Sequence, residues 1–312
     1  MAEQGTVIRS SGSIYGVRAM DGRLIDCRVK GNFRLKGIRS TNPVAVGDIV
    51  KFDVRPDGTA YIVEILERRN YIVRKASNLS KQSHILAANL DVCFLVVTIS
   101  HPATATTFID RFLAAAEAYR VPVVLVFNKC DLYDQSENEE LEYLTALYES
   151  IGYKCLHTSA TGQRGIDGLK EMMRGKVSLL AGNSGVGKSS LVNAIAPEIA
   201  AKVGEISKTH DTGMHTTTYT EMFEFMPESY IVDTPGVKGF GTYDMEIEEI
   251  SHYFVEFFEL SKECRYGNCT HTHEPGCAVV QALEEHRISQ SRYTSYLSIM
   301  EDSNPDKYRK PF

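Results

Sequence analysis

No apolar stretch of this sequence is long enough to cross a lipid bilayer. The longest runs, Leu90–Ile99 and Val121–Phe127, hold ten and seven residues, whereas a membrane-spanning helix needs about 20. The start of the chain has no basic region followed by an apolar stretch, so we expect no signal peptide. Internal repeats and low-complexity tracts are also missing. We therefore expect a protein without a membrane partner.

The cysteines do not form a disulfide pattern. There are seven, an odd number: Cys27, Cys93, Cys130 and Cys155 are scattered, and Cys264, Cys269 and Cys277 cluster. Such a distribution suits a reduced compartment and a metal site better than a disulfide framework. We therefore expect the protein to be cytoplasmic.

The bulk composition is that of a soluble globular protein. The 312 residues are 43% hydrophobic and 24% charged, and the length allows two or three domains. Residues 1–75 carry 14 Lys+Arg against 8 Asp+Glu, a net charge of +6, which leaves −12 for the rest of a chain whose total is −6. A basic N-terminal module favours an anionic partner, although a scattered surface charge remains the alternative.

Short alternating runs divided by turn signals fill residues 4–72. We expect strands at Thr6–Arg9, Ser13–Met20, Leu24–Val29, Asp48–Val54 and Ala60–Leu66. Asp-Gly pairs at 21–22 and 57–58 predict hairpin turns, and about five strands fit an OB-type β-barrel. The basic connection between the third and fourth strands predicts an RNA-binding surface, or otherwise an exposed loop; its cations are Lys30, Arg34, Lys36 and Arg39.

From residue 89 onward, strands and helices alternate. We expect strands at Leu90–Ser100, Val121–Phe127, Tyr153–His157 and Val177–Ala181, with helices at Ala103–Tyr119, Glu137–Ser150, Ile166–Arg174 and Lys188–Ile199. This alternation predicts a doubly wound parallel sheet, which binds ligands at the carboxyl ends of its strands. Two further helices are expected at Glu246–Leu260, with Phe254, Phe257 and Phe258 near one face, and over most of Ala278–Met300.

A phosphate-binding loop, G-x-x-x-x-G-K-[ST], lies between a predicted strand and a predicted helix. Glycines let backbone N–H groups surround a phosphate, and the helix N-terminus adds positive partial charge. Lys188 would reach the β- and γ-phosphates and Ser189 would ligate Mg²⁺. A glycine turn before a helix is the alternative, which this placement disfavours. The nucleotide contacts expected here are Gly182, Asn183, Ser184, Gly185, Val186, Gly187, Lys188, Ser189 and Ser190.

A guanine-reading motif, N-K-x-D, follows an earlier strand. Asp131 would accept from the two N–H donors of guanine, whereas adenine would leave that carboxylate unpaired, and Lys129 would pack along the base. Thr-Ser-Ala follows the next strand, where backbone N–H groups suit the guanine O6 atom. The residues expected around the base are Asn128, Lys129, Cys130, Asp131, Thr158, Ser159 and Ala160.

The order of these motifs is permuted. An ordinary small GTPase runs phosphate loop, switch threonine, D-x-x-G, N-K-x-D and S-A, whereas here the last two come first. D-x-x-G is Asp233 to Gly236, where Asp233 would hold Mg²⁺ through water and the Gly236 N–H would sense the γ-phosphate. The sequence therefore predicts a circularly permuted GTPase domain.

The group that activates water is not obvious from these motifs. Val237 follows Gly236, at a position where a glutamine often orients the attacking water. His215 is the nearest substitute, although it could equally be a surface histidine. One of Thr216, Thr217 and Thr218 should be the switch threonine, and Thr217 is our choice as Mg²⁺ ligand.

The cysteine cluster has the spacing of a structural metal site. Cys264, Cys269, His271 and Cys277 form C-x4-C-x-H-x5-C, a Cys₃His set that predicts one closed tetrahedral zinc site without catalytic function. His273 is a competing ligand for His271. A chance cluster of buried thiols is the alternative, which the density of Cys and His disfavours.

Together these motifs resemble the RsgA family of ribosome-small-subunit-dependent GTPases over nearly the whole chain, including the tail motif Arg292-Tyr293-x-x-Tyr296. The resemblance implies a cytoplasmic bacterial factor that binds the small subunit late in its maturation. It also implies GTP hydrolysis that is slow alone and stimulated by the subunit, with the switch histidine, here His215, as the proposed catalytic group. Met214 departs from the arginine common in the family.

We therefore expect three domains: a barrel at residues 1–74, a permuted GTPase domain at 75–243 and a helical zinc module at 244–312. The expected ligands are GTP, GDP, Mg²⁺ and Zn²⁺, and the expected partner of a monomeric chain is the small (30S) subunit with its rRNA. GTP would order the switch segments, and the zinc module would report that state to RNA. The alternatives are an RNA-binding assembly scaffold with nucleotide-tuned affinity and a GTPase acting on another RNA such as tRNA.

Overall fold

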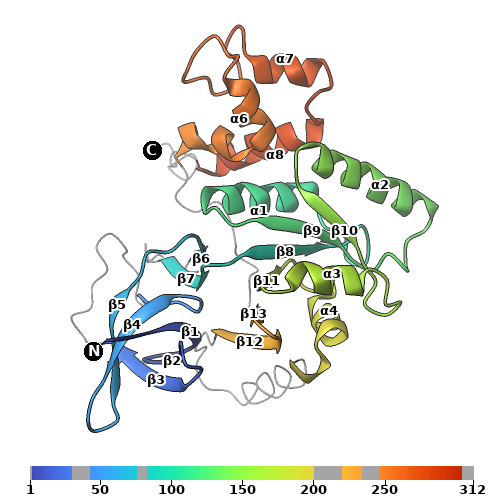
Figure 1. Ribbon diagram of the computed structural model, residues 1–312. Helices are drawn as coiled ribbons and strands as arrows, with labels where there is room; N and C mark the ends of the chain where they lie inside the picture. Colours follow the sequence, from blue (N-terminus) through green and yellow to red (C-terminus); the bar gives the residue numbers. More distant parts are fainter. Residues whose placement is uncertain (1, 30–42, 76–82, 200–219, 234–245, 304–312) are drawn as a thin grey trace, which may run out of the picture.

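The structure is a computed structural model that describes residues 2–29, 43–75, 83–199, 220–233 and 246–303. A barrel, a sheet with helices on both faces, and a group of C-terminal helices follow one another along the chain (Figure 1). No described helix has the length and apolar character that a membrane span requires.

The N-terminal strands form the expected barrel. They are β1 (Glu3–Ser11), β2 (Ile14–Ala19), β3 (Leu24–Val29), β4 (Ile49–Val54) and β5 (Ala60–Ile65). Their order is β1-β2-β3-β5-β4, and β4 pairs back onto β1 to close the barrel. Gly22 and Gly58 have φ of 87° and 82° at the two hairpin turns, a conformation that favours glycine. Alternate residues such as Val17 and Phe52 fill the interior.

A sheet of mainly parallel strands follows, as predicted. Five parallel strands and one antiparallel strand, β12, form it, in the order β10 (Lys154–His157), β9 (Val123–Phe127), β8 (Val92–Val97), β11 (Val177–Ala181), β13 (Ser229–Asp233), β12 (Thr220–Met226). Periodicity does not reveal β12 and β13. Along β8, Cys93 and Leu95 join one core cluster while Phe94 and Val96 join the other. Both faces are therefore buried, as in other parallel sheets.

Helices from the described part of the chain cover both faces of this sheet. In Figure 1, α1 (Thr106–Ala118) and α2 (Gln135–Ser150) lie on one side, with α3 (Ile166–Met173) and α4 (Lys188–Ile195) on the other. Helix α2 begins with a capping box, in which the Asp134 carboxylate accepts from the Glu137 N–H group at 2.9 Å. Helix α4 is shorter than predicted, because Ala196 precedes Pro197 and leaves helical backbone, with φ of −146° and ψ of 74°.

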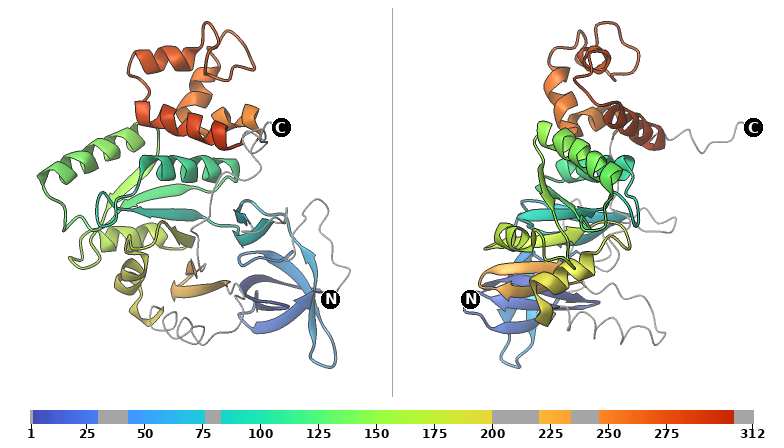
Figure 2. Two further views of the ribbon diagram at one scale, coloured as in Figure 1. Left: turned by 180° about the vertical axis from the view of Figure 1, so that it is seen from behind. Right: turned by 90° about the vertical axis from the view of Figure 1, so that its right-hand side faces the viewer.

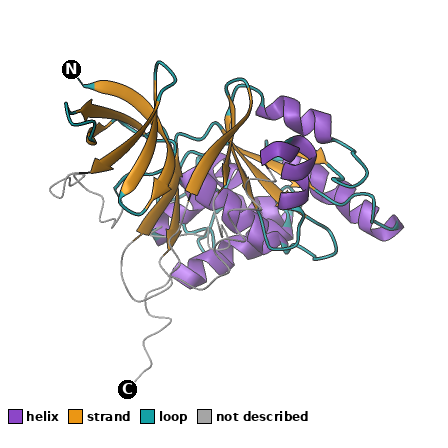
Figure 3. Ribbon diagram, turned by 90° about the horizontal axis from the view of Figure 1, so that it is seen from below, coloured by secondary structure: helices purple, strands orange, loops and turns teal. Residues whose placement is uncertain are grey.

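The barrel is joined edge to edge with the sheet of mainly parallel strands, which carries the predicted nucleotide motifs and is called the nucleotide sheet below. Strand β1 pairs with β12 through Arg9↔Glu221 and Ser10↔Thr220, so the described strands of both parts form one eleven-stranded sheet (Figure 3). A separate hairpin, β6 (Tyr71–Lys75) and β7 (Ser83–Ala88), lies between the two parts (Figure 2). Its register begins at Tyr71↔Ala88, and no turn dipeptide predicts it.

The C-terminal helices correct two predictions. We predicted one helix over Glu246–Leu260, but the segment forms two. A 3-10 helix, η2 (Ile247–Tyr253), is followed by Phe254 in extended backbone, and α6 (Val255–Ser261) begins after it. The break lets Phe254 pack under Arg292, while Phe257 turns toward His271. Phe258 is 44% exposed and does not share their face.

The second prediction, a largely helical stretch over Ala278–Met300, divides into α7 (Ala278–Glu284) and α8 (Gln290–Ser303). Between them His286 has a φ of 58°, which ends helical geometry without a glycine or proline to signal it. Helix α8 packs along α1, so the C-terminal helices sit on the nucleotide sheet (Figure 1).

Candidate functional site

The predicted nucleotide motifs meet at one edge of the sheet. N-K-x-D follows β9, Thr158-Ser159-Ala160 follows β10, the phosphate loop follows β11, and Asp233 ends β13. These strands are parallel, so their carboxyl ends share one edge, where sheets of this kind bind ligands. The sheet therefore brings together segments that lie more than 100 residues apart.

Asn128 ties three of these segments together. Its Nδ2 donates to the Val186 carbonyl oxygen at 2.9 Å, and the Thr158 hydroxyl donates to its Oδ1 at 3.0 Å. A Cβ atom at Gly187, where φ is 97°, would lie 2.3 Å from Asn128 Nδ2. Only glycine fits there, so the guanine motif and the phosphate loop are built against each other.

The phosphate loop is anchored at its centre by Val186, which is fully buried. The Lys188 ammonium donates to the carbonyl oxygens of Gly182 at 2.8 Å and Asn183 at 2.6 Å. This places the cation inside the curve of the loop, where phosphate oxygens would bind. Ser189 is exposed on the first turn of α4, a position from which its hydroxyl can reach an ion beside the phosphates.

Asp131 is exposed at the same edge, and its carboxylate accepts hydrogen bonds from the loop that follows β10. The Thr161 hydroxyl donates to its Oδ2 at 3.0 Å. A hydrogen bond from the Ser159 hydroxyl is the largest of the effects that lower the pKa of Asp131, so the group is a carboxylate at neutral pH. The Ser159 N–H donates to Arg164 O at 2.9 Å, which leaves the Ala160 N–H for a guanine O6.

Three contacts at this edge have no signal in the sequence. The Lys129 ammonium donates to the His101 carbonyl oxygen, which brings the segment after β8 against the guanine motif. Pro102 lies 3.4 Å from where a Cβ of Gly185 would be. Tyr133 donates its hydroxyl to Asn128 O and accepts from the Ile99 N–H at 3.0 Å. His101, Pro102 and Tyr133 belong to no motif, so only the fold brings them to this edge.

Several predicted site residues lie outside the described part of the chain. They are the switch residues His215, Thr216, Thr217 and Thr218, Gly236 and Val237 after β13, and the barrel-loop cations Lys30, Arg34, Lys36 and Arg39. Asp233 is described as the last residue of β13, without its side chain.

The four predicted metal ligands do come together. The ligand atoms of Cys264, Cys269, His271 and Cys277 all lie within 4.8 Å of one another. His271 Nδ1 is 3.6 Å from Cys264 Sγ and 3.4 Å from Cys277 Sγ. His273 is exposed and bonds the Thr272 hydroxyl instead, so it does not belong to the group. Three thiols and one imidazole at these separations could hold a metal ion with tetrahedral geometry.

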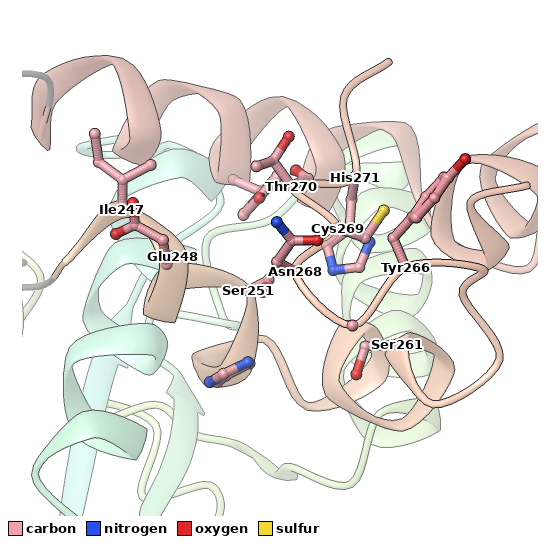
Figure 4. Close-up of a pocket in the computed structure, with 12 residues that line it drawn as sticks. Ile247, Glu248, Ser251, Ser261, Tyr266, Asn268, Cys269, Thr270 and His271 are labelled. Atoms are coloured by element: carbon pink, nitrogen blue, oxygen red, sulfur yellow. Dashed lines mark hydrogen bonds between the residues drawn. The ribbon is translucent and has the colours of Figure 1, made fainter. Parts of the chain in front are cut away.

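Helix α8 holds the loop of the Cys₃His group in place. The Tyr293 hydroxyl donates to His271 O at 2.8 Å, and the Tyr296 hydroxyl donates to Thr270 O at 2.6 Å. The tail motif of the sequence therefore orients the backbone on both sides of a predicted ligand. The loop also borders a pocket of about 190 Å³, where Cys269 and His271 lie close together (Figure 4).

A buried ion network fastens these helices to the nucleotide sheet. Arg292 is fully buried, with Nε and Nη2 on the Glu256 carboxylate at 2.7 and 2.9 Å and Nη1 on Asp110 at 2.9 Å. Asp110 also accepts from the hydroxyls of Ser295 and Tyr148. Breaking such a network by removing one partner leaves a buried charge uncompensated.

The comparisons with known proteins identify the family. The RsgA GTPase family model matches residues 65–243, and the RsgA N-terminal domain model matches residues 4–62. The chain belongs to the RsgA GTPase family. A Bacteroides fragilis protein named "Small ribosomal subunit biogenesis GTPase RsgA" is 60% identical over 309 residues, 99% of this chain and 100% of that one. A Porphyromonas gingivalis protein of the same name is 58% identical over 99% of both chains.

Two solved structures confirm the family fold. YjeQ from Thermotoga maritima has a TM-score of 0.77 at 34% identity, covering 97% of this chain and 98% of that one. YloQ, described as a circularly permuted GTPase, has a TM-score of 0.75 at 30% identity, covering 100% of this chain and 97% of that one. The prediction of a barrel, a permuted GTPase sheet and C-terminal helices with a Cys₃His cluster is confirmed.

Proposed function

We propose that this protein hydrolyses GTP to GDP and phosphate on the small ribosomal subunit, assists late maturation of that subunit and promotes release of its assembly factors. The observation that carries the proposal is the meeting of the guanine motif and the phosphate loop around Asn128. The names of the full-length relatives, which describe small-subunit biogenesis GTPases, support the choice of partner. The proposed location is the cytoplasm, and the proposed form is a monomer.

The nucleotide would lie along the carboxyl edge of the sheet. Asp131 would read the guanine donors, Ala160 N–H would bind O6, and Asn128 would keep the base pocket aligned with the phosphate loop. Lys188 would exchange the carbonyl oxygens of Gly182 and Asn183 for the phosphate oxygens of the ligand. The remaining predicted contacts, on the phosphate loop and around the base, would close around the nucleotide from both ends of this edge.

Magnesium would bind beside the phosphates. Ser189, Thr217 and Asp233 are the proposed ligands, and the exposed hydroxyl of Ser189 on the first turn of α4 fits that role. The ion would neutralise charge on the β- and γ-phosphates. Among the protein's own groups, we assign His215 the task of orienting the attacking water, because Val237 has no hydrogen-bonding side chain.

The C-terminal cluster would hold one structural zinc ion. Cys264, Cys269, His271 and Cys277 supply a complete four-ligand set, and the tyrosines of α8 already fix the backbone of the loop. Bound zinc would contribute folding energy to the module. We assign it no part in hydrolysis, since four protein ligands leave no open position.

The barrel would bind rRNA through the basic loop that carries Lys30, Arg34, Lys36 and Arg39. The net charge of +6 over residues 1–75 supports this assignment. We propose domain boundaries at residues 1–74, 75–243 and 244–312, which separate the RNA-binding, nucleotide-binding and zinc-binding parts.

A multiple-turnover assay tests the proposal. Phosphate release from GTP is measured with purified protein alone, with 30S particles and with an equal mass of tRNA. We expect 30S particles to raise turnover and tRNA to leave it unchanged, and Lys188→Ala to abolish activity in all three reactions. Equal stimulation by tRNA would favour a GTPase that acts on another RNA, and no turnover in any reaction would leave only a nucleotide-tuned binding protein.

A further inference from the structure

The loop after β10 turns back on itself directly behind Asp131. The Ser159 N–H donates to Arg164 O at 2.9 Å and closes the turn. Inside it, the Gly162 N–H donates to Ser159 Oγ at 2.8 Å. A Cβ at Gly162 would lie 3.0 Å from that oxygen, so the turn is as tight as a glycine allows there. The Ser159 hydroxyl oxygen is thereby used as an acceptor inside the turn.

Two hydroxyls of this turn bond the same carboxylate. Thr161 Oγ1 donates to Asp131 Oδ2 at 3.0 Å, and hydrogen bonding from the neighbouring Ser159 hydroxyl lowers the pKa of the same carboxyl group. The two hydroxyl oxygens are themselves 3.3 Å apart. Asp131 therefore has two donors from one turn, although the sequence motifs assign only Ser159 and Ala160 of that turn to the nucleotide site.

The donor count matches the chemistry of guanine. An ionised carboxylate offers about four acceptor positions on its two oxygens. If Ser159 and Thr161 occupy two, two remain, and guanine presents two N–H donors to this residue, on N1 and on the 2-amino group. A carboxylate held by both hydroxyls cannot rotate freely about its terminal torsion, which is otherwise broad. Its remaining acceptor positions then point in a fixed direction.

We propose that Thr161 is a positioning residue for guanine selection: its hydroxyl fixes the rotation of the Asp131 carboxylate so that both remaining acceptor positions meet the base together. This rests on the proposed binding of guanine nucleotides. Thr161 acts through Asp131 and touches no part of the base in this role. If the Thr161 hydroxyl is removed, the Asp131 carboxylate keeps only the bond from Ser159. It can then rotate about that bond, and it accepts from one N–H donor of the base at a time.

Inosine nucleotides separate positioning from simple loop stability, because hypoxanthine lacks the 2-amino group and offers Asp131 one donor. Dissociation constants of GDP and IDP are measured for the full-length protein and for Thr161→Val, which keeps the side-chain shape. We expect GDP affinity to fall on the order of tenfold, the cost of one hydrogen bond to a charged group. IDP affinity should fall much less, so the preference for GDP over IDP shrinks.

Two further variants make the result specific. Thr161→Ser keeps the hydroxyl and should restore most of the GDP preference. Gln163→Ala removes a bond from the same turn, to Ala160 O at 3.1 Å, without touching Asp131, and should leave the ratio of the two constants unchanged. An equal loss of GDP and IDP affinity in Thr161→Val would overturn the inference, since it would mean the turn is merely loosened.

Failure of the proposed function gives a different result. If the unmodified protein binds ADP as tightly as GDP, the guanine site itself is wrong. If GDP is preferred over ADP and IDP but Thr161→Val changes neither preference, only the role of Thr161 is wrong.

Discussion

Arg18 of the barrel bonds Glu224 of strand β12, with 2.6 Å between Nη1 and Oε2. The same guanidinium nitrogen donates to the Tyr230 hydroxyl at 3.0 Å, and the group lies 5.4 Å from the centre of the Tyr230 ring. Strand β12 follows the segment with the switch threonines, and β13 beside it ends at Asp233. The barrel is thus fastened to the two strands that flank the expected γ-phosphate sensors.

We predict that Arg18→Ala loosens the barrel from the nucleotide sheet. Among the residues that the structure describes, two pairs join β1 to β12, so we expect side-chain contacts to decide how often the strands separate. Backbone amides of residues 220–226 should exchange hydrogen faster in the variant. A double-mutant cycle with Glu224→Ala should give a coupling of about 0.2–1 kcal/mol, because the pair is partly exposed.

Arg23→Ala is the matched control for Arg18. Arg23 pairs with Glu3 and Asp21, both residues of the barrel, on the barrel surface. Its loss should leave exchange in β12 unchanged. If Arg18→Ala gives the same β12 exchange as Arg23→Ala, the backbone pairing alone holds the two parts together.

The sequence predicts strands that end in motifs far better than strands that do not. Strands β9 and β11 are apolar runs that are followed directly by recognisable nucleotide motifs, so the hydrophobic pattern and the motif indicate the same strand. Hairpin β6–β7 has no turn dipeptide, and β12–β13 closes through Pro227-Glu228, where Glu228 has a φ of 55°. Their pairing depends on partners distant in the chain, which local patterns do not carry.

The same reasoning explains the errors around the metal site. The run that includes Phe254 and Phe257 has helical spacing, and no glycine or proline marks the break. The break is set by tertiary packing, since Arg292 lies 4.5 Å over the Phe254 ring and is itself held by Glu256 and Asp110. The gathering of the Cys₃His group was predictable because the spacing of its members is that of a metal site.

Asp131→Asn should change which base is bound. The amide replaces one acceptor oxygen with a donor, which opposes guanine and suits the additional carbonyl of xanthine. We expect GDP affinity to fall about tenfold or more and XDP affinity to rise. Hydrogen bonds lower the pKa of Asp131, so the unmodified protein should keep its preference between about pH 6 and 8. Equal binding of GDP and ADP by the unmodified protein would contradict the assignment.

Removing one thiol of the Cys₃His group should abolish metal binding. Elemental analysis of protein purified without chelators should find about one zinc ion per chain, and close to none in Cys277→Ala. Because binding energy at such a site is folding energy, the C-terminal helices should become sensitive to proteolysis while GDP binding largely survives. Cys155→Ala, on β10, is the control and should keep its zinc. Finding no zinc in the unmodified protein would rule this site out.

Charge reversal in the barrel loop should weaken subunit binding through phosphates. For Arg34→Glu, Lys36→Glu and Arg39→Glu combined, we expect lower 30S affinity and a salt dependence flatter by about 2–3 in the log–log slope. Intrinsic hydrolysis should stay near that of the unmodified protein. The control reverses Lys154, Lys170 and Arg174, which lie outside the barrel. Unchanged 30S affinity in the loop variant would show that the loop is only a solvated surface.

Hydrolysis needs a group that Val237 does not provide. His215 is close in sequence to the switch threonines, and the subunit would dock that segment so that the imidazole comes within hydrogen-bond reach of the attacking water. We predict that His215→Ala keeps GTP affinity but loses on the order of a hundredfold or more of the 30S-stimulated rate. Val237→Ala should change the chemical step little, since an apolar side chain orients no water.

Single-turnover reactions with saturating 30S particles decide between two sources of catalysis. In this regime binding is complete, so the rate reports the chemical step rather than docking. A slow His215→Ala reaction beside a normal Val237→Ala reaction places the water-orienting group in this chain. If His215→Ala hydrolyses GTP as fast as the unmodified protein, the histidine is structural. The subunit itself would then become the leading candidate for supplying the stimulating group.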